Sequence, residues 1–244
     1  MNKFKIFSAS VALKPLYKIG DHSTYGSLVR TLDLSMLGGR WEKLGFKDLA
    51  PVFECCTSMK GIDLGLCQHI KDAQMIKLFE DNPHLSTNII HLNLDEVMLT
   101  DETLAKIVRM LPSLQQLDIA ETHAGYDTCA AIGDCLPNLK SLVLEDCEDI
   151  DDECIEKIAK GCTDLAYLKI RGCTSILTDS VGDILMEYDN FAVVSEGSGD
   201  DYENDDMYED GEYPYEDYNY NDYDSDEDDY YDDYYEDNKD DDED

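Results

Sequence analysis

Cysteine, histidine and carboxylate side chains are the groups in this chain that could perform chemistry, as metal ligands, nucleophiles or proton carriers. The 244 residues include nine cysteines, five histidines and 56 Asp or Glu residues. Zinc sites usually place two cysteines three residues apart. No pair here has that spacing, and Cys55 and Cys56 are adjacent, which is poor geometry for one ion. The histidines are scattered singly, at His22, His69, His84, His91 and His123.

The sequence also contains no motif of a phosphate-binding or calcium-binding loop. The early glycines do not form a glycine-rich phosphate loop, and no stretch has the ligand spacing and turn glycine of an EF-hand. Carboxylates are so numerous that any pair chosen as catalytic acid and base would be arbitrary. We therefore expect no catalytic residue, no metal site and no cofactor, and we interpret the chain as a binding protein and not an enzyme.

Negative charge is concentrated at one end of the chain. Residues 195–244 hold 26 Asp or Glu against one basic residue, Lys239, so they have a net charge of −25 out of the total of −37. Met207 is the only aliphatic residue after Val194. Because such a segment cannot bury a core and repels itself, we predict a disordered tail. It would also repel phosphates, which argues against a nucleic-acid partner.

Three roles for this tail remain open. It could keep the protein soluble, or bind basic proteins such as histones, with its eleven tyrosines adding cation–π contacts. It could instead fold back on Lys169 and Arg171. Ser225, in the run Ser-Asp-Glu-Asp, matches the context of an acidophilic kinase and is a candidate phosphosite.

The apolar stretches and the cysteines of the chain indicate its cellular compartment. No run approaches the roughly 18 uncharged apolar residues of a membrane span, so we expect no membrane association. The first residues faintly resemble a signal peptide, but Lys5 and Lys14 interrupt and close the apolar stretch. An odd number of cysteines at fixed points of a repeat favours reduced, buried thiols. We therefore expect the cytoplasm, the nucleus or both.

A pattern of apolar residues at positions 1, 4 and 6 recurs along the chain. It begins at Val29, Met59, Ile89, Leu114, Leu139 and Leu165, with starts 30, 30, 25, 25 and 26 residues apart. Self-similarity at this period is typical of solenoids, whose repeats bury their apolar faces only by stacking. Each match therefore predicts a short buried strand.

Helix signals follow each predicted strand. Polar pairs such as Thr100-Asp101 and Asp151-Asp152 come first, and their side-chain oxygens suit helix N-caps. Apolar residues at helical spacing come next. Cysteines close the helices, at Cys56, Cys135 and Cys162.

The combined pattern Cys-x-x-Leu-x-x-Leu-x-Leu-x-x-Cys-x-x-Ile-x-Asp resembles the leucine-rich repeats of F-box/LRR proteins and of the related antagonist-of-mitotic-exit-network proteins. It is clearest at 135–152 and 162–179 and partly present at 56–72. The resemblance implies an α/β leucine-rich-repeat solenoid of about six repeats, with parallel strands on the concave face and helices on the convex face. It also implies an adaptor that recognises protein substrates together with ubiquitin-ligase subunits.

These patterns divide the chain into three parts. Residues 1–27 form an N-terminal segment, a remnant or a cap; residues 28–190 form the leucine-rich-repeat domain; and residues 191–244 form the disordered Asp/Glu/Tyr-rich tail. An F-box would be a helical module before the repeats, and residues 1–27 show no leucine-rich helical pattern.

Strand residues that flank the core leucines should point to the concave face. The partner-binding candidates are Asp33, Asp63, His91, Asn93, Asp95, Gln116, Asp118, Glu145, Tyr167, Lys169 and Arg171. The four aspartates of this set would form an acidic ladder. The last repeat instead presents Tyr167, Lys169 and Arg171. Two interpretations stay open: a merely solvated face, or a surface that binds a basic segment of a protein client, since solenoids bind along this side.

Two functions follow from different features. The repeats favour a protein-binding adaptor, for substrate recognition in ubiquitin-dependent (SCF-type) degradation or cell-cycle control. The tail favours the alternative, an acidic chaperone-like protein that binds basic clients such as histones outside any ligase. Deletion of residues 195–244 discriminates them, because an adaptor keeps its client and a chaperone loses it.

Overall fold

The structure is a computed structural model that describes residues 3–5, 26–34, 45–177 and 192–194. The chain divides into two compact units, Met1–Ser198 and Gly199–Asp244, and every described residue belongs to the first. Within the predicted disordered tail, Ala192–Val194 instead form a strand that pairs with Tyr167–Lys169. Ser225 and residues 195–244 lie outside the described residues.

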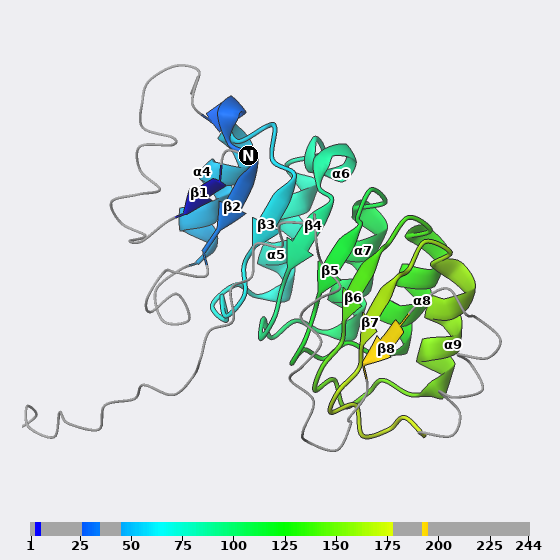
Figure 1. Cartoon of the computed structure of the whole chain (residues 1–244). Coiled ribbons are helices and arrows are strands. Elements are labelled where there is room, and N and C mark those ends of the chain that lie inside the picture. Colours follow the sequence, from blue (N-terminus) through cyan, green and yellow to red (C-terminus); the bar gives the residue numbers. More distant parts are fainter. Residues whose placement is uncertain (1–2, 6–25, 35–44, 178–191, 195–244) are drawn as a thin grey trace, which may run out of the picture. The chain divides into compact units, whose positions relative to one another are not determined.

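A parallel sheet of eight strands runs through the first unit, with the strands side by side in chain order (Figure 1). The strands are β1 (Lys3–Lys5), β2 (Thr31–Asp33), β3 (Gly61–Asp63), β4 (His91–Asn93), β5 (Gln116–Asp118), β6 (Ser141–Val143), β7 (Tyr167–Lys169) and β8 (Ala192–Val194). Strands β2 to β7 coincide with the six strands that the repeat predicts. β1 and β8 extend the sheet at its two edges.

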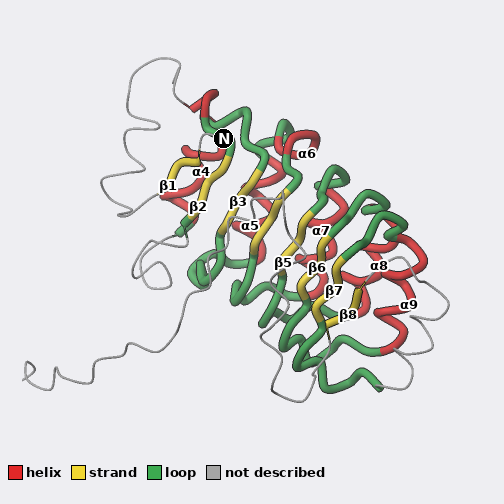
Figure 2. Tube along the Cα trace, viewed as in Figure 1, coloured by secondary structure: helices red, strands yellow, loops and turns green. Residues whose placement is uncertain are grey.

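Helices connect successive strands and lie on one side of the sheet (Figure 2). They are the 3-10 turn η1 (Gly26–Leu28) and the α-helices α4 (Phe46–Cys55), α5 (Asp72–Glu80), α6 (Leu85–Asn88), α7 (Asp101–Met110), α8 (Tyr126–Cys135) and α9 (Asp152–Gly161). Parallel strands need such crossovers. The architecture is the α/β leucine-rich-repeat solenoid that the sequence predicts.

The short helix α6 was not predicted. It lies between α5 and β4 and takes up part of the 30-residue spacing of that repeat. Asn82 stabilises the turn between α5 and α6, because its side-chain amide donates a hydrogen bond to the carbonyl oxygen of Leu78 at 2.7 Å.

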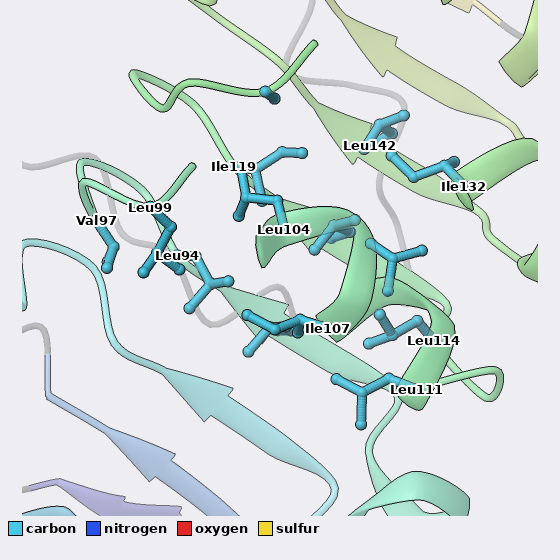
Figure 3. Packing of buried hydrophobic residues seen from close by; sticks show 14 of the residues in the cluster. Leu94, Val97, Leu99, Leu104, Ile107, Leu111, Leu114, Ile119, Ile132 and Leu142 are labelled. Atoms are coloured by element: carbon cyan, nitrogen blue, oxygen red, sulfur yellow. The ribbon is translucent and has the colours of Figure 1, made fainter. Parts of the chain in front are cut away.

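The apolar positions of the repeat form one core between the sheet and the helices. The middle residue of each central strand is almost inaccessible, as Leu92, Leu117 and Leu142 are at most 2% exposed. Figure 3 shows side chains such as Leu94 and Ile107 pointing into this space from a strand end and a helix. Full burial of such a side chain stabilises the fold by about 1.5–3 kcal/mol, so stacking of repeats holds the array together.

Seven of the nine cysteines are buried, as the repeat predicts. Their thiols link neighbouring repeats: Cys147 Sγ donates to the carbonyl oxygen of Ile119 at 3.3 Å, and Cys173 Sγ to that of Leu144 at 3.0 Å. Burial raises the pKa of Cys162 and of Cys173 to about 12. A nucleophile or a zinc ligand must be a thiolate, whereas these groups stay protonated and act as small, weakly donating core residues.

The predicted helix caps are partly confirmed. Thr100 and Asp151 are N-caps of α7 and α9 and accept hydrogen bonds from the backbone N–H groups of Thr103 and Cys154. The N-cap of α5 is instead Lys71, whose backbone N–H donates to Gln74 Oε1 at 3.1 Å. Capping of the first turn there comes from a side chain inside the helix.

The aspartates that follow these caps reach into the next repeat. Asp101 accepts hydrogen bonds at 2.9 Å from the backbone N–H groups of Gly125, Asp127 and Thr128. The N-cap of α8 is Gly125, which has no side-chain cap. Asp101 of α7 therefore satisfies the orphan donors of the following helix.

Candidate protein-binding surface

The strand face is the side of the sheet away from the core, and its side chains form rows across the strands. The middle residue of each strand from β2 to β7 is buried in the core, so the residues before and after it point outward. The first row contains Thr31, Gly61, His91, Gln116, Ser141 and Tyr167; the second contains Asp33, Asp63, Asn93, Asp118, Val143 and Lys169. Two residues beyond each strand's second-row position lies a third row, with Gly65, Asp95, Ala120, Glu145 and Arg171.

The four aspartates of the expected ladder lie in two rows of the strand face. Asp33, Asp63 and Asp118 share the second row, where Asn93 holds the β4 position. Asp95 lies two residues further along the chain and belongs to the third row. The carboxylates therefore form two adjacent rows and not a single line.

Three second-row side chains also shape the backbone. Asp63 Oδ1 accepts from the N–H of Gly65 at 3.0 Å, Asn93 Oδ1 from Asp95 at 2.8 Å, and Asp118 Oδ1 from Ala120 at 3.1 Å. Each is a side-chain bond to the backbone two residues on, typical of an Asx turn. These residues therefore turn the chain out of its strand, in addition to lining the face.

Immediately after the third row, each repeat from β3 to β7 has a residue whose backbone φ is positive, in the left-handed region; we call these residues the left-handed column. Leu66, Glu96, Glu121, Asp146 and Gly172 have φ between 50° and 76°. The N–H of Glu96 donates to the carbonyl oxygen of Ala120 at 3.0 Å, and that of Glu121 to Glu145 at 2.8 Å. Glu96, Glu121 and Asp146 were not among the predicted surface residues, although their equal spacing from the repeat's leucines was a usable signal.

Six carboxylates crowd at the carboxyl ends of β3 to β6, and we call them the acidic cluster: Asp63, Asp95, Glu96, Asp118, Glu121 and Glu145. Carboxylate oxygens of Asp95, Glu96 and Glu121 lie within 4.8 Å of one another. Burial, and then the charge of Asp118, Glu96, Glu121 and Asp63, raise the pKa of Asp95 to about 7. Burial, with Glu145 adding to it, raises the pKa of Asp118 to about 6. Neighbouring negative charges oppose the ionisation of each of these two carboxyl groups.

Three carboxylates are an incomplete set of ligands for a metal ion. Calcium takes six to eight oxygen ligands, whereas the group at Asp95 offers one atom from each of three residues. The expectation that the chain holds no metal site stays a prediction.

Strand β7 brings basic side chains to the face. Lys169 Nζ lies 2.8 Å from Glu145 Oε2. Although burial opposes it, the Glu145 carboxylate raises the pKa of Lys169, so this lysine stays charged. Arg171 in the third row is exposed, and Tyr167 in the first row is half-buried. Basic side chains therefore lie beside the carboxylate of Glu145, and their role in binding stays a prediction.

His91 and Gln116 lie side by side in the first row. Burial lowers the pKa of His91, with Gln116 opposing the shift. Its Nδ1 atom is buried and has no hydrogen-bond partner among the described residues. A neutral, half-buried imidazole contributes shape to the face and no charge near pH 7.

A family-model scan matches no family to this chain. The DNA repair protein rhp7 of Schizosaccharomyces pombe is 30% identical over 168 residues, which cover 64% of this chain and 29% of that protein. Lysine-specific demethylase 2B of Mus musculus is 24% identical over 147 residues, or 54% of this chain and 11% of that protein. The chain thus spans less than a third of the length of either relative.

Among solved structures, the complex of Rad7 and Elc1 in yeast contains a similar fold. The match has a TM-score of 0.56 and 20% identity, and it covers 66% of this chain and 40% of that one. This likeness concerns the fold. Within the described residues, no helix is both long and apolar enough to cross a membrane. Fold and comparisons together support a general role in protein interaction.

Proposed function

We propose that this chain is a leucine-rich-repeat adaptor that holds a protein client in a nuclear complex for DNA repair and ubiquitin-dependent degradation. The observation that carries the proposal is the 30% identity to the DNA repair protein rhp7, over a stretch as long as the repeats. The fold it shares with a chain of the Rad7–Elc1 complex supports a protein partner of the ligase-subunit kind. No catalytic step is assigned to the chain.

The repeats and the tail have separate roles in this proposal. Residues 28–190 bind the client, and residues 191–244 keep the adaptor soluble. The stacked core gives the repeats a fixed strand face, which a solenoid needs to bind along its length.

Affinity purification of the tagged full chain from its source cells, followed by mass spectrometry, tests the proposal. We expect ubiquitin-ligase subunits and DNA-repair proteins to co-purify. Leu142→Asp, which places a charge in the core at a residue that is 0% exposed, should abolish capture, whereas Leu177→Asp, at a residue that is 65% exposed, should preserve it. If Leu142→Asp captures the same proteins as the wild type, the folded repeats are not needed for the interaction.

A chaperone for basic clients is the second candidate function. The observation that favours it is the net charge of −25 on residues 195–244, which would attract basic proteins at long range. Deletion of these residues separates the two functions: the adaptor keeps its client, and the chaperone releases it.

A further inference from the structure

The strand face is divided lengthwise into a neutral half and an acidic half. The first row holds no Asp, Glu, Lys or Arg residue from β2 to β7. The second row, the third row and the left-handed column contain the acidic cluster. Because strand polarity is the same throughout a parallel sheet, all these carboxylates gather at the carboxyl ends of the strands.

Among the described residues, few basic side chains belong to the rows of this acidic half. In the described second and third rows, the basic residues are Lys169 and Arg171, both in the repeat of β7. Lys169 is engaged with Glu145. Neighbouring carboxylates oppose the ionisation of Asp95 and Asp118, and a cation supplied from outside would stabilise their ionised form.

Small residues keep the acidic half open to a partner's backbone. Gly65 and Ala120 occupy the third row on either side of Asp95. A Cβ atom at Gly65 would lie 3.3 Å from Asp63 Oδ1 and 3.6 Å from Asn93 Oδ1. Oxygen atoms thus border a position that has no side chain of its own.

We propose that the acidic half of the strand face, over β3 to β6, docks an extended basic segment of a partner protein. The segment crosses the strands and places Lys or Arg side chains among Asp95, Asp118 and Glu121. This inference rests on the proposed protein-binding function and names the chemistry of its partner.

The spacing of the sheet sets the spacing of the basic residues. Neighbouring strands lie about 4.8 Å apart, and alternate side chains of an extended peptide lie about 6.7 Å apart on one side. Two or three basic residues at alternate positions therefore span β4 to β6. Arginine fits best, because its planar guanidinium can bind two carboxylate oxygens at once.

Photo-crosslinking of the full chain tests this docking site. The probe is a short peptide with three arginines at alternate positions and a photo-reactive group at one end, and its control has glutamine in place of each arginine. The test variant is Asp95→Asn with Asp118→Asn. The matched control is Glu54→Gln with Asp134→Asn, which removes equal charge from exposed helix positions. Mass spectrometry locates the crosslinks, so binding to the tail is counted separately.

We expect the arginine peptide to crosslink to residues 91–121 of the wild type and of the matched control. In the test variant this yield should fall roughly tenfold, because a charge-assisted hydrogen bond contributes about 1.5–3 kcal/mol. Crosslinks confined to residues 195–244, or equal yields in both variants, would overturn the proposal.

Client capture distinguishes failure of this inference from failure of the proposed function. If the tagged wild type and the test variant retain the same client equally, the docking site is wrong and the adaptor function stands. If the wild type captures no protein at all, the adaptor function fails as well.

Discussion

Gly161 at the end of α9 packs directly against Gly133 of α8, so that a Cβ atom on Gly161 would overlap the carbonyl oxygen of Gly133. A Cβ on Gly133 would in turn approach the carbonyl oxygen of Lys157. The two helices therefore touch through their backbones. This contact sets the spacing, behind the strand face, of the two repeats that begin at Leu114 and Leu139.

Gly161→Ala should destabilise the protein by about 1–3 kcal/mol, because the extra methyl group forces the two helices apart. The free energy of unfolding from urea titration measures the change. Gly45→Ala is the control, since a Cβ there meets nothing within 4 Å; it should cost less than Gly161→Ala. A Gly161→Ala protein as stable as the wild type would show that α8 and α9 do not pack this closely.

Asp101→Ala should cost about 2–3 kcal/mol, because it leaves three donors at the start of α8 without their acceptor. Asp101→Asn retains one acceptor oxygen and should cost less. Asp134→Asn, at an exposed position of α8, is the control for loss of one charge. Equal unfolding midpoints for Asp101→Ala and Asp134→Asn would contradict this role for Asp101.

The strands could be predicted from the sequence because each repeat places its leucines at the same positions. The middle residues Leu32 to Leu168 are buried as expected, and helices begin within one residue of the predicted polar pairs. The rows of the strand face could not be predicted as well. Asp63 and Asp95 fall in different rows, and the contact between their side chains depends on the turn that follows each strand, which forms only between neighbouring repeats.

The role of Asp101 was hidden for the same reason. A sequence pattern places it beside Thr100 as a cap of its own helix, whereas its three partners lie 24 to 27 residues later. The left-handed turns at Glu96 and Glu121 carry residues other than glycine, so they lack the usual signal of a turn. Contacts between repeats, and not within them, therefore account for most of what the sequence did not reveal.

Asp95 should make stability depend on pH. Its pKa is raised from 3.8 to about 7 in the folded state, so between these values the folded protein holds a proton that the unfolded chain has lost. The free energy of unfolding therefore falls as pH rises from about 4 to about 7. Asp95→Asn removes this contribution, and after allowance for solvent screening it should stabilise the protein at pH 8 by about 1–2 kcal/mol.

Urea titrations of wild type and Asp95→Asn at several pH values measure this effect. The difference between the two proteins should grow through the interval from pH 4 to pH 7 and then stay constant. Asp134→Asn, at an exposed position of α8, serves as the control for the loss of one carboxylate. A constant difference at every pH would mean that Asp95 ionises in the folded protein as it does in the unfolded chain.

Thiol reactivity should follow burial. Cys55 and Cys135 are half-buried and the other seven cysteines are buried, and burial raises the pKa of Cys147 as well as of Cys162 and Cys173. Because the thiolate is the reactive form, iodoacetamide at pH 8 should label Cys55 and Cys135 first. Peptide mapping of the labelled native protein gives the order. Early labelling of Cys147 or Cys173 would show that the repeats open locally.

We expect above all that the strand face of the repeats binds a protein partner. Hydrogen exchange of the full chain, alone and with its co-purified client, tests this claim most directly. We predict that the client slows exchange in peptides covering residues 91–96 and 116–121, while peptides from α8 and α9 remain unchanged. Slowed exchange confined to the helices, or to residues 195–244, would contradict the account.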